Sequence, residues 1–336
     1  MKRSICTVCA LIFCLLAGCG GPASASTDFF SMDTFMTITA WAENEADAQA
    51  VVTQAERRVN DLNNALSRQI EAGPLAQLNA AGGQTVTLDP DTYDALSRAV
   101  EYAALTGGAF DPTTAPLSDL WGIGTDQAAV PSQAAIDEAL SHVGYENIEL
   151  LGNNQARLLN GAQVDLGGIG KGYATDAVAA LRADAPMLAQ LGGNIGAYGQ
   201  NPSSEDGLWT IGLAEPDNSA NYIAMLHVCD QSVVTSGDYE RYFEQDGVRY
   251  HHIFDPSTGA PAQTGLRSVT VVDELSARAD AFTTALFVMG LERGLEFCAA
   301  HDVDAVFVTD DKTIYVTEGL RGQLTLSEDT SYVLAQ

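Results

Sequence analysis

The segment that most constrains this chain of 336 residues lies in its middle, at Asp165–Ala174, and reads D-L-G-G-I-G-K-G-Y-A. Glycine has no Cβ atom, so a turn rich in glycine lets backbone N–H and C=O groups approach a ligand closely. A helical pattern follows over residues 173–181, and helix N-termini favour anions. Lys171 lies at this helix start, where the helix dipole alone disfavours a positive charge. The segment therefore predicts a bound anion such as a phosphate.

Two familiar phosphate-binding motifs do not describe this segment. It is not a Walker A loop, because Gly172 rather than Ser or Thr follows Lys171. Its glycines also do not match the G-x-G-x-x-G spacing of a dinucleotide-binding turn. An ordinary strand-to-helix turn without a ligand is therefore an alternative on these residues alone.

The first residues have the pattern of an exported lipoprotein. Lys2 and Arg3 precede a largely apolar run, residues 5–17, that is too short to span a membrane in the mature protein. The motif Leu16-Ala17-Gly18-Cys19 resembles a bacterial lipobox, in which the cysteine is lipidated and becomes the new N-terminus. We expect a protein held on the bacterial cell membrane outside the cytoplasm; a plain secretory signal cut elsewhere is the alternative. The expected segments are a signal peptide at 1–18, a flexible tether at 19–27 that starts with lipidated Cys19, and one domain at 28–336.

Charge argues against one class of partner. The chain has 44 Asp and Glu residues against 16 Lys and Arg residues, a formal net charge of −28 at pH 7. Nucleic-acid backbones need a basic surface, so we expect no nucleic-acid partner. A phosphate ligand on so acidic a protein needs a metal ion or a local basic group at its site.

Two cysteines, Cys229 and Cys298, lie outside the N-terminal segment, each in an apolar run. They could pair in an oxidising compartment. Buried free thiols are the favoured interpretation, because unpaired cysteine is among the most buried residue types.

Hydrophobic periodicity predicts many strands, with helices in blocks. Helices are expected over residues 45–66, 75–81, 91–105, 132–143, 173–181, 276–288 and 292–301. Strands are expected over residues 33–41, 268–272, 305–308, 314–317 and 323–326, and in much of 186–255, where Asp246-Gly247 indicates a hairpin. The fold class is therefore α+β, a single two-lobed domain with a ligand cleft between the lobes.

Two late segments could carry chemistry. Asp280 and Thr284 lie four residues apart at a helix start and share a face, so they could supply oxygens to a hard cation such as Mg²⁺; ordinary helix-start residues are the alternative. His251 and His252 are adjacent on a strand and point to opposite faces, so at most one can serve a given site. A surface or core histidine is the alternative for each.

These segments together resemble the ApbE family of FAD:protein FMN transferases, many of which are exported lipoproteins. Met32-Asp33-Thr34 resembles the early M-G-T of that family, with Asp33 in place of glycine. At Gln69, many members carry an aromatic residue, so a flavin contact is not carried over there, although Asn79 is retained. The other matching segments, in chain order, are Ala109–Thr113, Asp165–Ala174, Leu191–Asn194, Ser236–Arg241, His252–Gly259 and Ala279–Thr284.

The resemblance implies two sets of ligand contacts in an ApbE-like domain with the FAD cleft between its lobes. Contacts to FAD are implied for Met32, Ala109, Phe110, Asp111, Asp165, Lys171 and Ile253. Ligands to Mg²⁺ are implied for the backbone oxygen of Gly168 and for Asp280, Thr283 and Thr284.

The resemblance also implies a reaction, in which Mg²⁺-dependent transfer moves FMN from FAD to a Ser or Thr hydroxyl of a partner protein and releases AMP. His252 is the candidate general base, because an unperturbed imidazole titrates near neutrality, and Asp280 is the second candidate. Implied acceptors are exported flavoproteins, either subunits of Na⁺-pumping NADH:quinone oxidoreductase and Rnf-type complexes or extracellular flavin reductases, with a D-x-x-[ST]-x-A-[ST] segment. Two other functions stay open: a metal-dependent FAD pyrophosphatase that gives FMN and AMP, and a non-catalytic flavin-binding lipoprotein.

Overall fold

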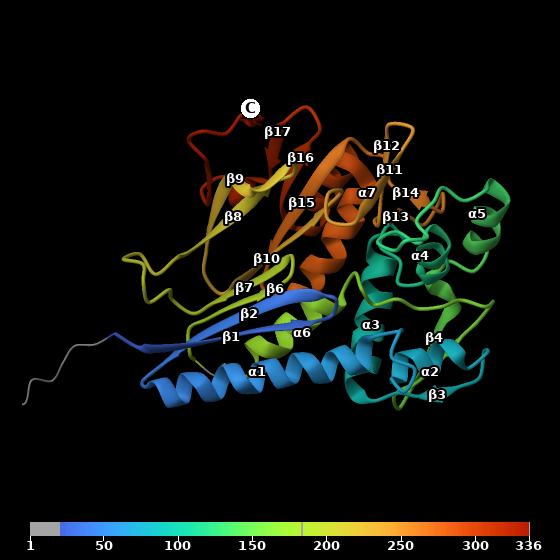
Figure 1. The fold of residues 1–336 in the computed structure, drawn as a ribbon, viewed down its shortest axis with the longest axis horizontal. Helices are drawn as coiled ribbons and strands as arrows, with labels where there is room; N and C mark the ends of the chain where they lie inside the picture. The colour runs from blue at the N-terminus through green and yellow to red at the C-terminus, as the bar shows by residue number, and fades with distance from the viewer. Residues whose placement is uncertain (1–20, 183, 336) are drawn as a thin grey trace, which may run out of the picture.

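The computed structural model describes residues 21–182 and 184–335, so the expected signal peptide and Cys19 lie outside the described residues. A nine-stranded sheet dominates one lobe of the molecule (Figure 1). Its neighbouring strands pair antiparallel except the last two, which are parallel. In spatial order the strands are β1 (Ala23–Ser31), β2 (Thr34–Ala42), β6 (Met187–Leu191), β7 (Asn194–Tyr198), β10 (Gln231–Gly237), β15 (Leu266–Asp273), β16 (Asp304–Thr309), β17 (Thr313–Val316) and β19 (Val333–Leu334).

The remaining elements flank this sheet and build the second lobe around α2–α5 and β3–β5 (Figure 1). The helices are α1 (Glu45–Leu66), α2 (Pro74–Ala80), α3 (Pro90–Leu105), α4 (Ala115–Trp121), α5 (Gln133–Leu140), α6 (Gly170–Ala179) and α7 (Ser276–His301). The short strands are β3 (Val86–Thr87), β4 (Ile148–Gly152), β5 (Gln155–Leu158), β8 (Trp209–Glu215), β9 (Asn218–Val228), β11 (Tyr242–Gln245), β12 (Val248–His251), β13 (Phe254–Asp255), β14 (Ala260–Pro261) and β18 (Leu324–Leu326).

Two hydrophobic cores lie on opposite faces of the large sheet. Helices α1, α6 and α7 pack on one face, where Ile38 of β2, Leu62 of α1 and Phe282 of α7 belong to one buried cluster. On the other face, the sheet β8–β9–β18 packs Trp209 and Leu226 into a second cluster. The expected mixed architecture of helix and sheet is thus confirmed.

Helix α1 follows directly from the sequence pattern. It begins at Glu45 and ends at Leu66, as predicted, and Asn44 caps it by accepting a hydrogen bond from the Asp47 N–H at 3.0 Å. Its buried side chains fall at steps of three or four residues from Ala48 to Leu66. Each fully buried Val or Leu stabilises the fold by about 1.5–3 kcal/mol relative to an exposed one.

Helix α6 begins at Gly170, earlier than the expected start at residue 173. The glycines of the central segment therefore form the first helical turn themselves. At Gly172 this has a packing reason, because a Cβ atom there would collide with the backbone oxygen of Ser276 at the start of α7. Part of the glycine content thus allows two helices to approach each other closely, independently of any ligand.

Helix α7 contains a break at the place where the sequence predicts two helices. Gly290 has φ 76° and ψ 179°, a conformation that favours glycine. The Thr264 hydroxyl donates to the Phe287 carbonyl at 3.1 Å next to the break. This bond links the loop before β15 to the turn of α7 that precedes the break.

The expected tether needs a correction. Ala23–Thr27 belongs to strand β1 and pairs with residues 38–42 of β2, and the Thr27 hydroxyl donates to Glu56 of α1 at 2.8 Å. Strand pairing and this contact order residues whose small polar composition indicates a flexible segment. Among the described residues, no helix combines the length and the apolar character needed to cross a membrane.

The cysteine expectation is confirmed in one respect and wrong in another. Cys229 and Cys298 are both free thiols, as expected. Only Cys298 is buried, whereas Cys229 is partly exposed beside Asp230. An apolar neighbourhood in sequence did not ensure burial, because Cys229 lies in the turn between β9 and β10.

Candidate active site

Helices α6 and α7 start side by side and cap each other. Asp280 of α7 accepts a hydrogen bond from the Gly172 N–H of α6 at 2.9 Å. In return, Asp176 of α6 accepts from the first N–H groups of α7, at Ser276 (2.7 Å) and Ala277 (3.0 Å). Burial raises the pKa of Asp176 to about 6, opposed by these two hydrogen bonds. Carboxylates at helix N-termini satisfy donors that have no partner within the helix.

This junction places Lys171 beside Asp280. The Lys171 ammonium lies 3.7 Å from Asp280 Oδ1 and donates to the Gly167 carbonyl at 3.4 Å. Asp280 is 3% exposed. Lys171 is only partly buried. In this ion pair the carboxylate is therefore buried and the ammonium is the group that solvent can reach.

Further oxygen atoms gather at the same place. A Cβ atom built on Gly168 would lie 3.8 Å from Thr284 Oγ1 and 3.1 Å from the Phe110 ring, so the turn, α7 and the second lobe meet there. Thr283 is different from Thr284, because it is fully buried and its hydroxyl donates to the Asp280 carbonyl at 2.8 Å. Thr283 Oγ1 also pairs with Ser236 Oγ at 2.9 Å. Its hydroxyl is thus already engaged within the protein.

These residues fit a hard cation only if a substrate completes the coordination. In the part of the chain that the structure describes, no group of three or more His, Cys, Asp or Glu side chains could hold a metal. Within the same residues, Asp280 Oδ1 accepts no hydrogen bond, and Thr284 and Gly168 offer a hydroxyl and a carbonyl. Mg²⁺ is commonly bound by one or two carboxylates together with substrate phosphates. The donor set fits that chemistry.

Asp165 shapes the turn that carries Gly168. Its Oδ1 accepts from the Gly167 N–H at 2.8 Å and its Oδ2 from Arg68 Nε at 2.9 Å. Asn79 holds the residue before it, with two 2.8 Å bonds to the backbone of Val164. Arg68 is a residue that the sequence argument missed as a site component. The one sequence feature that pointed to Arg68 was its position directly before Gln69, where the chain departs from the family that it resembles.

The loop that contains Ala109, Phe110 and Asp111 reaches the junction through Phe110. The Phe110 ring is buried against Gly168, and Ala109 is half-buried beside it. The Asp111 carboxylate accepts from the N–H and hydroxyl of Thr113, at 2.8 and 2.5 Å, and from the Tyr145 N–H at 2.9 Å. Burial raises the pKa of Asp111, and the bonds from Thr113 oppose this shift. These contacts make Asp111 a residue that holds the loop in shape.

The two adjacent histidines have separate environments, although only His251 lies on strand β12 and His252 lies in the bend that follows it. His251 is 3% exposed, lies 2.8 Å from the Ala262 carbonyl through Nε2 and packs edge-on against Phe287. His252 is partly exposed, and its Nδ1 lies 3.3 Å from the Arg241 carbonyl. An Nδ1–H donor to that carbonyl leaves Nε2 with a free lone pair. His251 is thus a core residue, and His252 is the candidate that can meet a ligand.

The acid–base premise for His252 needs a correction. Surrounding protein, chiefly through desolvation and then through Arg241, lowers the pKa of His252 to about 3. The ring is therefore neutral at physiological pH and a weaker base than an unperturbed imidazole. The expectation of a titration near neutrality is wrong because the bend after β12 places this ring among protein atoms and near two cations, Arg241 and Lys171.

Glu240 is a charged group at this site that the sequence argument did not assign. A Cβ atom built on Gly193 would lie 3.4 Å from its Oε1. The side chain is accessible to solvent, yet desolvation raises its pKa, opposed by Lys171 and Arg241. A carboxylate that solvent reaches, but that neighbouring protein atoms still desolvate, is surrounded by protein on several sides. The signal was present in the segment Ser236–Arg241, although no chemistry pointed to its glutamate.

The predicted flavin contacts Met32 and Ile253 differ in what they offer. Met32 lies at the turn between β1 and β2, and its N–H donates to Asn63 Oδ1 at 3.2 Å. Ile253 is 3% exposed, its carbonyl accepts from Ala262 and its N–H donates to His251. The structure therefore leaves Ile253 no free polar group, while the Met32 side chain stays partly open.

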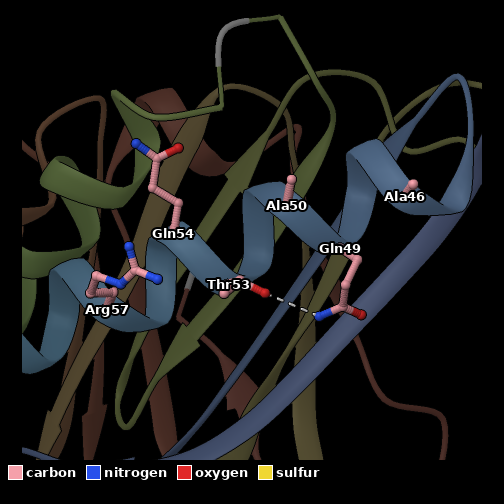
Figure 2. Close-up of a pocket in the computed structure, with 6 residues that line it drawn as sticks. All are labelled: Ala46, Gln49, Ala50, Thr53, Gln54 and Arg57. Atoms are coloured by element: carbon pink, nitrogen blue, oxygen red, sulfur yellow. Dashed lines mark hydrogen bonds between the residues drawn. The ribbon is translucent and has the colours of Figure 1, made fainter.

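Two surface hollows do not coincide with this junction. One, of about 250 Å³, lies between Asp111, Tyr145 and Pro256 at the edge of the second lobe. The other, of about 510 Å³, lies on the solvent side of α1, where Figure 2 shows Gln54 and Arg57 projecting outward and Gln49 bonded to Thr53. Neither hollow includes Lys171 or Asp280, so the chemistry of the side chains, and not hollow size, locates the candidate site.

Known proteins resemble this chain over most of its length. The model of the ApbE family matches residues 32–307. The FAD:protein FMN transferase of Treponema pallidum (strain Nichols) is 35% identical over 336 aligned residues, which cover 93% of each chain. The FAD:protein FMN transferase of Vibrio cholerae serotype O1 is 32% identical and covers 88% of this chain and 92% of its own. The solved ApbE protein of Thermotoga maritima superposes with a TM-score of 0.83 at 32% identity, covering 90% of this chain and 99% of its own.

Proposed function

Because the chain belongs to the ApbE family and is a flavin transferase by that membership, we propose that it moves FMN from FAD to a Ser or Thr hydroxyl of an acceptor protein. The acceptor oxygen attacks the phosphorus of the FMN half and forms a phosphoester with it. The bond from this phosphorus to the bridging oxygen breaks, and AMP leaves with that oxygen. The names of its relatives support the general reaction. The Ser or Thr acceptor and the release of AMP are our own extension.

The observation that carries the proposal is the shared start of α6 and α7. There a partly exposed cation, Lys171, lies 3.7 Å from a buried carboxylate, Asp280, and near the oxygens of Thr284 and Gly168. A pyrophosphate on an acidic protein needs a metal ion or a local basic group, and this junction offers a basic group together with oxygens that could hold a metal ion. When bound, Mg²⁺ would supply Lewis-acid stabilisation of the phosphate oxygens, held by Asp280, Thr284 and the Gly168 carbonyl.

The residues around the junction position the substrate and receive a proton. Lys171 attracts the phosphates. The glycine-rich turn, which Asp165 holds in shape, presents backbone groups to them. His252, neutral and with Nε2 free, takes the hydroxyl proton of the acceptor. Asp280 is the poorer base, because it already accepts from Gly172 and faces Lys171. Positioning and charge stabilisation supply most of the catalysis in phosphoryl transfer generally.

We further propose that the protein works outside the cytoplasm, anchored to the cell membrane through a lipid on Cys19. Acceptors would then be exported flavoproteins, such as subunits of Na⁺-pumping NADH:quinone oxidoreductase or Rnf-type complexes, or extracellular flavin reductases. The lipobox-like Leu16-Ala17-Gly18-Cys19 supports the anchor. Mass spectrometry of the protein from its own membrane, before and after lipid removal, tests it.

The test of the reaction uses soluble protein starting after Cys19, FAD, Mg²⁺ and a small domain carrying a D-x-x-T-x-A-T segment. Intact mass of that domain should show added FMN with wild-type protein. Asp280→Asn should lower the rate about 100-fold or more, because several kcal/mol of charge stabilisation are lost. Asp304→Asn, on the remote strand β16, is the matched control and should keep the wild-type rate.

Other products decide between the alternatives. Released AMP and free FMN without a labelled acceptor would identify an FAD pyrophosphatase. Bound FAD with neither product would identify a flavin-binding protein. Full labelling by Asp280→Asn would contradict the role of the junction.

A further inference from the structure

Two exposed aromatic rings stand at the tip of the β1–β2 hairpin. Phe30 and Phe35 are directly paired across the two strands, with ring centroids 5.3 Å apart and an edge-to-face angle of 74°. Phe30 is 60% exposed and Phe35 is 82% exposed, the highest value for a large apolar side chain among the described residues. Exposed apolar pairs of this kind are unusual unless a partner covers them.

The pair does not serve the core of this chain. Alternation along the strands sends Phe29 and Met36 toward α1, where they join the main cluster, and sends Phe30 and Phe35 to the opposite face. On that face the β8–β9–β18 sheet covers the far end of the hairpin, where Trp41 packs on Trp209. Of the described residues, none is recorded as packing aromatically on the two phenylalanines except each other.

The hairpin tip touches the candidate active site. Between the two rings lies the turn Met32-Asp33, and Thr34 follows it. A Cβ atom built on Gly192 would lie 3.0 Å from Thr34 and 3.5 Å from Lys171 Cδ. Thr34 and the Lys171 stem therefore flank the same glycine. A polypeptide that brings a hydroxyl to Lys171 passes close to this tip.

We propose that Phe30 and Phe35 form a docking surface for the acceptor protein, next to its Ser or Thr. This inference rests on the proposed function, because only a protein acceptor needs a surface beyond the FAD site. The charge around the rings defines the partner further. Residues 23–42 contain Asp28 and Asp33 but no Lys or Arg, so the fitting partner is apolar with neutral or basic flanks. An anionic membrane attracts basic segments, so an anionic membrane does not fit this acidic hairpin.

The test compares Phe35→Ser and the double variant Phe30→Ser/Phe35→Ser with Leu151→Ser. Leu151 is a 46% exposed apolar residue of β4 in the other lobe, so it controls for loss of surface hydrophobicity alone. Labelling of the acceptor domain is followed by intact mass at several acceptor concentrations, and FAD affinity is followed by flavin fluorescence. We expect kcat/KM for the acceptor to fall about tenfold or more in the double variant, with FAD affinity and Tm unchanged.

Several outcomes would overturn the proposal. Acceptor kcat/KM equal to that of Leu151→Ser shows that the rings do not dock the acceptor. Reduced FAD affinity in the same variants assigns the hairpin to the flavin. Loss of a wild-type dimer in sedimentation assigns it to a second copy of this chain. If wild-type protein binds FAD but labels no acceptor domain, the proposed function is contradicted. This inference, which rests on it, is then contradicted as well.

Discussion

The α6–α7 junction and the β1–β2 hairpin tip meet at Lys171, yet they are built in opposite ways. At the junction, polar groups are buried and bonded across long sequence distances, as in the Gly172–Asp280 bond. At the tip, two phenylalanines stand in solvent. A phosphate-containing ligand has one shape and benefits from fixed groups, whereas protein acceptors differ in their surfaces. Under the proposed function, the rigid junction is the region that would hold the phosphate ligand, and the exposed tip is the region that would meet the acceptor polypeptide.

The largest effect should come from a change that breaks the junction itself. Gly172→Ala places a Cβ atom against the Ser276 backbone oxygen, which must separate α6 from α7 and should lower the free energy of unfolding by about 3 kcal/mol. Gly170→Ala is the matched control in the same helical turn. Its Cβ atom would have its nearest neighbour at 4.0 Å, so urea unfolding should show no loss. Equal destabilisation of both variants would contradict the packing role of Gly172.

The next effect concerns the charge at the junction. Lys171→Gln removes the ammonium that lies 3.7 Å from Asp280 and should weaken FAD binding about tenfold, because charge-assisted contacts to phosphate are lost. Lys312→Gln, near the C-terminus, should bind FAD like the wild type. Fluorescence titration measures both. A Lys171→Gln variant that binds FAD with wild-type affinity would contradict a role of the glycine-rich turn in phosphate binding.

A pH experiment tests His252, whose pKa is lowered in part by Lys171 at the junction. Its folded-state pKa of about 3 is below the unfolded value of 6.5, so between these values the unfolded chain binds more protons. Stability should therefore fall as pH decreases from 6.5 toward 3, and His252→Gln should remove part of that fall. Because His251 shifts in the same direction, part of the fall should persist. Urea unfolding at several pH values measures this difference.

The lowered pKa of His252 also predicts how the labelling rate depends on pH. Between pH 8 and pH 5, protonation of His252 should not reduce the labelling rate, because the ring stays neutral over this range. A rate that falls with a midpoint near 6.5 and loses that midpoint in His252→Gln would show an unshifted histidine instead.

The smallest effect is expected at the hairpin turn. Asp33 has φ 58°, in the left-handed region, where Asp is tolerated better than branched residues. Asp33→Gly should be neutral or slightly stabilising, and Asp33→Val should cost about 1 kcal/mol. Thermal unfolding compares the two variants. A stable Asp33→Val would mean that the tip can change conformation, contrary to a preformed docking surface.

The sequence alone predicted most local structure and the parts of the site. The apolar periodicity from Ala48 to Leu66 predicted α1 with its Asn44 cap, and Asp246-Gly247 predicted the β11–β12 hairpin. Such features depend on neighbours within a few residues. The start of α6 was missed because contacts with α7, distant in sequence, override the local signals there. The strand at Ala23–Ser31 was missed because pairing with the next strand, β2, orders residues whose small polar composition indicates a flexible segment.

What the sequence by itself determined is the inventory: a glycine-rich turn with Lys171, a helix-start Asp280, two adjacent histidines and a chain in the ApbE pattern. The tertiary structure alone decided how these act. It buried His251 in the core and left His252 partly exposed beside Arg241, and it lowered the pKa of His252. It also engaged the Thr283 hydroxyl and placed Glu240 and the phenylalanine pair beside the site. The reason is physical, because desolvation, charge proximity and exposure depend on which distant segments meet, and those meetings are set by packing across the whole fold.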